Sequence, residues 1–232
     1  MTLKKTILKY LPLDYFRSYR SYSQEGEDMV LRSFYEGKKG YKGFYIDIGA
    51  HHPYRFSNTM HFYKHGWKGI NIEPTPTVIK LFKIFRKRDI TLNIGIAANR
   101  QKLKFYCFDE PALNGFSEEL SNERNEHSKY KILKTIDIDT YPLAEVLDTY
   151  LPANQAIDFL SIDVEGLDFQ VLKSNNWEKY QPQYILIEDK IAVKELEGSE
   201  IYTYLNNKGY ELVAKTLRTL FFKKIIYSPF IF

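Results

Sequence analysis

The sequence predicts an α/β fold: a Rossmann-like, doubly wound, mostly parallel sheet with a C-terminal antiparallel hairpin. Two observations predict it. From residue 23 onward, short apolar runs typical of buried strands alternate with segments whose apolar residues recur at helical spacing. Near the end, two strand-like runs, 210–216 and 219–224, flank a connection of only two residues, which is typical of a hairpin.

The first half of the chain supplies the first strands of this pattern. The apolar side of the segment Gln24–Tyr35 predicts a helix, and glycines then separate it from the buried strand Phe44–Ile48. The remaining expected elements of this half are a helix at 57–66, a strand at 69–73 ending before Pro74, a helix at 76–88, a strand at 91–96 and an antiparallel edge strand at 103–108.

The second half repeats the alternation. Its expected elements are strands at 133–138, 158–163 and 184–188 and helices at 143–150, 166–174 and 199–208. Between the halves lies the polar segment 109–131, rich in Glu, Asn and Ser. We expect either a mobile lid over a substrate or a solvated loop there.

Composition excludes several classes of protein. The 232 residues suit one compact domain, 23–232, preceded by an arm, 1–22. A net charge of +4 is too small to argue for a nucleic-acid partner, and no apolar run is long enough for a membrane span or a signal peptide. The lone Cys107 has no partner for an internal disulfide, so we expect a cytoplasmic location.

The arm 1–22 is basic and amphipathic, but Pro12 interrupts it. We therefore favour a short helix packed on the domain, or an arm swapped within a homodimer, over a peripheral membrane contact. The apolar residues 225–232 are expected to dock on a neighbour or to fray.

Carboxylates follow four of the predicted strands, at the edge where open α/β sheets bind ligands. They are Asp47, Glu73, the pair Asp163 and Glu165, and the pair Glu188 and Asp189. A carboxylate is costly to bury without a partner, so four such places together indicate a site.

Glu73 follows Gly49 by about 20 residues, the spacing at which an acidic side chain reaches the ribose of a bound nucleoside. The turn from Asp47 to Pro53 lacks the further glycines that a pyrophosphate requires. Adjacent carboxylates suit a cationic, phosphate-free nucleoside such as S-adenosylmethionine.

Five motifs occur in the order seen in the FkbM methyltransferases. They are the runs SQEGED (23–28), YIDIGAH (45–51), GINIEP (69–74), NIGI (93–96) and SIDVEG (161–166). From about Tyr22 to Lys190 the chain thus resembles that family, which implies the class I methyltransferase fold and S-adenosylmethionine as cofactor. The resemblance further implies cofactor contacts from Gln24, Asp47, Gly49, Ala50, Glu73 and Asn93.

The resemblance also implies methyl transfer to a hydroxyl of a sugar or other glycosylated acceptor, near Asp163 and Glu165. Such a transfer needs an aligned oxygen and a group that removes its proton, a role open to either carboxylate. Alternatively, Asp163, Glu188 and Asp189 hold Mg²⁺, as in related macrocin-type sugar O-methyltransferases. The third interpretation of Glu188 and Asp189 is a simple capping role or an ion pair with Lys190.

This chain departs from many relatives at His51 and His52, which follow the Gly-Ala turn. A histidine there could act as a base, although we favour a hydrogen bond to the backbone.

Two other functions stay open at this level. One is a nucleotide- or NAD-dependent enzyme on the same fold, which the missing glycines disfavour. The other is a non-catalytic glycan- or membrane-binding module, which the carboxylates at the strand ends disfavour.

Overall fold

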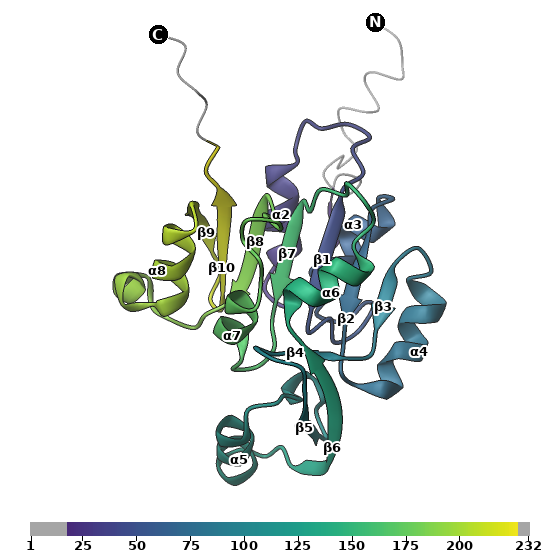
Figure 1. Ribbon diagram of the computed structural model, residues 1–232, viewed down its shortest axis with the longest axis vertical. Helices are drawn as coiled ribbons and strands as arrows, with labels where there is room; N and C mark the ends of the chain where they lie inside the picture. The colour runs from purple at the N-terminus through teal and green to yellow at the C-terminus, as the bar shows by residue number, and fades with distance from the viewer. Residues whose placement is uncertain (1–17, 227–232) are drawn as a thin grey trace, which may run out of the picture.

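The computed structural model describes residues 18–226. Its main element is a seven-stranded sheet in the order β3-β2-β1-β7-β8-β10-β9 (Figure 1). The strands are β1 (Phe44–Ile48), β2 (Lys68–Ile72), β3 (Ile90–Leu92), β7 (Phe159–Ile162), β8 (Tyr184–Glu188), β9 (Tyr210–Lys215) and β10 (Thr219–Lys224). Neighbours pair in parallel except β10, which is antiparallel to both β8 and β9. The predicted fold class is therefore confirmed, including the hairpin.

Two helical layers cover the sheet because side chains alternate between its faces. Phe44, Ile46 and Ile48 of β1 pack in one core with α6 (Leu143–Tyr150), α7 (Asp168–Lys173) and α8 (Glu200–Asn207). Tyr45, between them, belongs to a second core with α2 (Glu27–Phe34) and α3 (Met60–Lys64). α4 (Pro76–Phe85) contacts the edge strand β3. Both faces are thus buried, as a doubly wound sheet requires.

A second, three-stranded sheet extends from the carboxyl edge of the main one (Figure 1). It contains β4 (Gly95–Ile96), β5 (Gln101–Phe108) and β6 (Ile132–Tyr141), with β6 in the middle. The antiparallel edge strand predicted at 103–108 is confirmed as β5, but the edge is that of the small sheet, where its partner is β6.

The prediction of a single strand at 91–96 is wrong, because the chain leaves the main sheet after β3 and enters the small sheet at β4. Asn93 stands at the break, where its side-chain amide donates to the carbonyls of Glu73 (2.9 Å) and Pro74 (2.8 Å). These bonds tie the turn to the loop after β2. Apolar periodicity does not reveal such a turn, because Ile94 and Ile96 stay apolar in either sheet.

The segment 109–131 is not a plain loop. It contains a 3₁₀ turn at Pro111–Leu113 and the helix α5 (Glu118–His127), whose N-cap Ser117 accepts a hydrogen bond from the backbone of Leu120. Most other expected helices are correct in place but shorter than predicted; α2, for example, begins only after Gly26, whose φ is 88°. A further 3₁₀ turn spans Val193–Gly198.

Within 18–226, no helix has the length and apolar character of a membrane span. The expectations for 1–17 and 227–232, which cover most of the arm and of the apolar tail, fall outside the described residues.

Candidate functional site

A cavity of ≈ 70 Å³ lies at the carboxyl edge of the main sheet, beside the switch point between β1 and β7. The turns after β1, β2 and β7 form one side of it, and the small sheet with its insertion 109–131 forms the other. Its lining includes Gln24, Gly49, His51, Phe56, Glu73, Phe105, Asn114, Phe116, Asp163 and Glu165. Small-molecule sites usually measure a few hundred Å³. This cavity is smaller than that, and residues of the insertion, among them Pro111 and Phe116, contribute to its lining.

Glu73 lines the cavity and holds the two turns beside it. Its carboxylate accepts a 2.7 Å hydrogen bond from the backbone N–H of His51 and another, also 2.7 Å, from that of Thr75. Only 4% of Glu73 is exposed, and desolvation raises its pKa, although the bonds from Thr75 and His51 oppose the rise. Each oxygen keeps a lone pair for a further donor.

Gly49 allows the turn after β1 to touch the turn after β7. Its φ is +79°, and a β-carbon there would lie 1.7 Å from the carbonyl oxygen of Asp163. Backbone atoms cannot move aside as a flexible side chain can, so only glycine fits. The predicted glycine turn is present, and its function is the close approach of two strand ends.

Three predicted cofactor contacts, Asp47, Ala50 and Asn93, are not among the residues that line this cavity. Asp47 is 4% exposed and accepts a 2.9 Å bond from the hydroxyl of Thr59, while Ala50 is buried and donates its N–H to Ile72. Asn93 makes the turn described above. Burial raises the pKa of Asp47 to about 6, although the bond from Thr59 and the charge of Arg86 oppose the rise. These residues shape the wall, whereas Gln24, Gly49 and Glu73 face the cavity.

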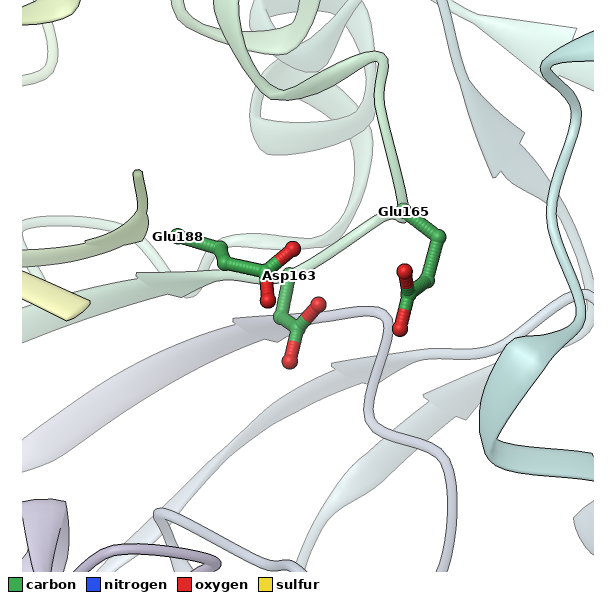
Figure 2. Close-up of side chains that lie close together, drawn as sticks. All are labelled: Asp163, Glu165 and Glu188. Carbon is green, nitrogen blue, oxygen red and sulfur yellow. The ribbon is translucent and has the colours of Figure 1, made fainter. Parts of the chain in front are cut away.

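Three carboxylates converge beside the cavity: Asp163 after β7 and Glu165 on the following loop line it, and Glu188 at the end of β8 lies next to them (Figure 2). One oxygen of each lies within 4.8 Å of the others. The side chain of Asp163 is open to the cavity, yet protein surrounds it closely on its other sides. Desolvation and the charges of Glu188 and Glu165 therefore raise its pKa well above the usual value.

The cluster carries its own counter-charges. Arg124 of α5 pairs with Glu165, and Lys190 pairs with Glu188 at 3.2 Å. Burial and the charge of Glu165 raise the pKa of Glu188 to about 7, although Lys190 opposes the rise. Because the pKa values of Asp163 and Glu188 are raised, the two cations do not fully offset the repulsion among the three carboxyl groups, and a further positive group beside them would favour their ionised forms.

Asp189, predicted as a metal ligand, does not join this cluster. One oxygen accepts from the backbone of Ile191 (2.9 Å) and the other from the hydroxyl of Ser199 (2.6 Å), so Asp189 fixes the entry to α8. Glu165 takes its place beside Asp163 and Glu188. Of the two acidic residues at this strand end, only Glu188 belongs to the site, and Asp189 instead holds the loop before α8 through Ile191 and Ser199.

A strained loop positions Glu165. The φ of Glu165 is 54°, and the φ of the next residue, Gly166, is 105°. The buried Asp168 stabilises this shape by accepting the N–H groups of Val164 (3.0 Å) and Gly166 (3.1 Å). Left-handed backbone at a non-glycine residue is unfavourable and persists only where surrounding bonds hold it. Sequence reasoning missed Asp168, although a carboxylate at the first turn of a helix was a signal for it.

Two ion pairs connect the insertion to the site. Arg55, on the loop after β1, donates both guanidinium N–H groups to Glu110, at 2.8 and 3.0 Å, and Arg124 reaches Glu165 as described. The amide of Asn114 lies 3.4 Å from the hydroxyl of Thr75. Sequence reasoning identified neither arginine, because the pairing joins segments far apart in the chain.

The two histidines have different environments. The Nδ1 atom of His52 accepts the N–H groups of Tyr54 and Arg55, both at 3.1 Å, which is the backbone role that we favoured. His51 faces the cavity with a φ of 49°, and its buried Nε2 has no hydrogen-bond partner within 18–226. Burial, then the charge of Arg55, lowers its pKa to about 4. It is therefore neutral at pH 7 and a weak base.

Comparisons with known proteins address identity. Residues 47–212 match the family model described as the methyltransferase FkbM domain. No curated protein matches significantly. The chain is similar to the crystal structure of precorrin-6y C5,15-methyltransferase from Geobacter metallireducens GS-15, with 10% identity and a TM-score of 0.42 over 85% of this chain and 88% of that one. The family model spans well over half of the sequence, although the first of the five motifs, 23–28, lies before the matched residues. The predicted resemblance is confirmed: the chain belongs to the FkbM methyltransferase family.

Proposed function

We propose that this methyltransferase transfers a methyl group from S-adenosylmethionine to a hydroxyl of a sugar-containing acceptor. One observation carries the proposal: Asp163 lines both the main cavity and a second small cavity, and Gln24 and Phe56 also line both. A carboxylate between two cavities can meet a cofactor from one side and an acceptor from the other.

The side chains that line the main cavity suit a nucleoside cofactor. Glu73 offers lone pairs to ribose hydroxyls, and the carboxylate cluster suits a sulfonium charge. The unpartnered Nε2 of His51 offers a further polar contact. When bound, S-adenosylmethionine supplies an electrophilic methyl group. The volume of ≈ 70 Å³ requires the insertion to move outward before such a ligand enters.

The second cavity supports a hydroxyl-rich acceptor. Its lining includes Gln24, Glu27, Asn58, Glu188 and Thr219, which offer amide, hydroxyl and carboxylate groups. Polar groups of this kind bind and orient sugar hydroxyls through hydrogen bonds. The residues come from four separate parts of the chain, of which Glu188 and Thr219 belong to paired strands of the main sheet.

Asp163 is the residue that we assign to the acceptor proton. Its raised pKa makes it a stronger base than an ordinary aspartate, and its openness to the cavity gives it access. A base at this position accepts the hydroxyl proton as the oxygen becomes nucleophilic. Glu165, paired with Arg124, helps to keep the cluster negative.

A divalent cation is the second candidate role for the cluster. The oxygens of Asp163, Glu165 and Glu188 are close enough to share one hard cation, which would hold acceptor hydroxyls and lower the pKa of one. Arg124 and Lys190 would then exchange their present partners for other contacts.

The test is transfer of labelled methyl from S-adenosylmethionine to a panel of sugars and nucleotide sugars, with and without EDTA. We expect labelled product from at least one acceptor. Loss of activity in EDTA that Mg²⁺ restores selects the cation, and full activity in EDTA selects the base alone. Labelling of proteins or nucleic acids in place of sugars would contradict the acceptor class.

A further inference from the structure

The opposite end of the molecule from the site carries a surface that the methyltransferase reaction does not use. The parallel strands begin there, and the segments that precede β1, β2 and β3 present exposed basic side chains. We call this surface the basic face; it consists of Arg20, Lys38, Lys39, Lys42, Lys64, Lys68, Lys87 and Arg88.

Contacts show that the basic face is continuous. Arg88 stacks on Tyr63 at 3.9 Å, and the ammonium group of the neighbouring Lys64 lies 2.9 Å from the hydroxyl of Tyr22. Arg20 lies over the same Tyr22 ring at 5.3 Å. On the other side, a hollow of ≈ 480 Å³ is lined by Lys38 and Lys39 together with Tyr19, Tyr41 and Trp67.

The positive charge of the basic face is largely unbalanced. In the described segments 18–24, 35–43, 63–68 and 86–89, Glu36 is the one exposed acidic side chain, because Asp89 is buried against Arg86. None of the eight basic residues forms an ion pair with another residue of 18–226. The opposite edge of the sheet, by contrast, carries the carboxylate cluster.

Exposed aromatic rings accompany the cations. Tyr19 is 61% exposed and Tyr41 is 44% exposed, and both border the hollow. Tyrosine combines an apolar ring with a polar hydroxyl, and it is enriched where proteins meet the headgroup region of a bilayer. Basic residues alone would suit any polyanion. The exposed tyrosine rings favour a partner that has an apolar layer beneath its negative charges, as a bilayer does.

Both described ends of the chain lie at this same end of the molecule (Figure 1). The sequences that continue from these two ends again contain basic residues and apolar or aromatic residues. Residues 1–17 contain Lys4, Lys5, Lys9 and Arg17 among leucines and isoleucines, and residues 227–232 read YSPFIF. Stable attachment of a protein to a membrane usually needs both a basic patch and an apolar anchor.

From these observations we propose that the basic face binds an anionic phospholipid membrane, with the cavity at the carboxyl edge directed away from it. Lipid phosphates contact the lysines and the hollow, and Tyr19 and Tyr41 enter the headgroup layer. Electrostatic attachment of this kind weakens as ionic strength rises.

The test is cosedimentation of the 232-residue chain with vesicles of phosphatidylcholine, alone or mixed with phosphatidylglycerol. We expect binding to the anionic vesicles only, and release by salt. Each lysine near an anionic surface contributes about fivefold in affinity, so the triple variant Lys38→Gln, Lys39→Gln, Lys42→Gln should bind about 100-fold more weakly.

The matched control is Lys102→Gln, Lys104→Gln, Lys134→Gln. It removes the same charge from exposed positions of the small sheet and should bind as the wild type does. The proposal is overturned if the wild type does not bind anionic vesicles, if both triple variants lose affinity equally, or if neither variant loses affinity. Tighter binding to double-stranded DNA than to the anionic vesicles would also overturn it, in favour of a nucleic-acid surface.

Discussion

Replacing Gly49 with alanine tests the contact between the turns after β1 and β7. Two costs add at this position. Left-handed backbone costs alanine roughly 1–2 kcal/mol relative to glycine. A β-carbon 1.7 Å from the Asp163 carbonyl oxygen also forces the two turns apart, and overpacking of this kind costs about 1–3 kcal/mol. We therefore expect Gly49→Ala to lower the free energy of unfolding by about 2–5 kcal/mol.

Gly209 provides a matched control. Its φ is +80°, against +79° at Gly49, but a β-carbon there would meet nothing within 4 Å. Gly209→Ala therefore bears the backbone cost without the clash, and should lose only roughly 1–2 kcal/mol. The difference between the two variants measures the contact itself.

The assay is urea unfolding of both variants and the wild type, followed by calorimetry with S-adenosylhomocysteine. We expect Gly49→Ala to be the less stable variant and to bind the ligand more weakly, whereas Gly209→Ala should bind normally. Equal losses in the two variants would refute the reasoning, because they would mean that the turns are free to separate.

Three further predictions follow from the site. Asp163→Asn should slow methyl transfer about 100-fold while S-adenosylhomocysteine affinity stays near that of the wild type; full activity would remove Asp163 from the reaction. Arg55→Ala breaks the partly exposed pair with Glu110, so it should cost less than about 1 kcal/mol of stability yet speed hydrogen exchange in 109–131. Exchange there as slow as in β1 would contradict a lid. Folding raises the pKa of Asp47 from 3.8 to about 6, so the folded state binds its proton more tightly; the contribution of Asp47 to stability should be highest below pH 4 and fall as the pH rises to 6. Asp47→Asn should remove that fall, on the order of 3 kcal/mol, in urea unfolding at several pH values; an identical pH profile would contradict the shift.

Local patterns in the sequence predicted the main sheet well. β1, β2, β7 and β8 are apolar runs buried on both faces, and their ends carry the carboxylates that mark the site. Apolar periodicity reports burial, but it does not report which sheet a strand joins. The sequence therefore predicted a single strand at 91–96 and did not reveal that β4 and β5 belong to a separate sheet, since that choice depends on the turn at Asn93 and on the pairing of β5 with β6.

The site was predictable in position but not in detail. Glu188 and Asp189 are neighbours in sequence, yet only Glu188 reaches Asp163, because Ser199 and the backbone of Ile191 hold Asp189 elsewhere. Arg124 and Arg55 reach the site from segments distant in sequence. Side-chain direction and long-range pairing follow from the packed fold, which composition and spacing do not encode directly.

Calorimetry of the wild type and Glu73→Gln with S-adenosylhomocysteine and NAD tests the central claim most directly, namely that the cavity between Gly49 and Glu73 binds S-adenosylmethionine. The wild type should bind S-adenosylhomocysteine and not NAD. Glu73→Gln should lose about 2–3 kcal/mol of that binding, the scale of hydrogen bonds to a charged group. Glutamine also places an amide opposite one backbone N–H, so folding of the variant must be verified by urea unfolding. Preferential binding of NAD, or unchanged affinity in a folded Glu73→Gln variant, would contradict the account.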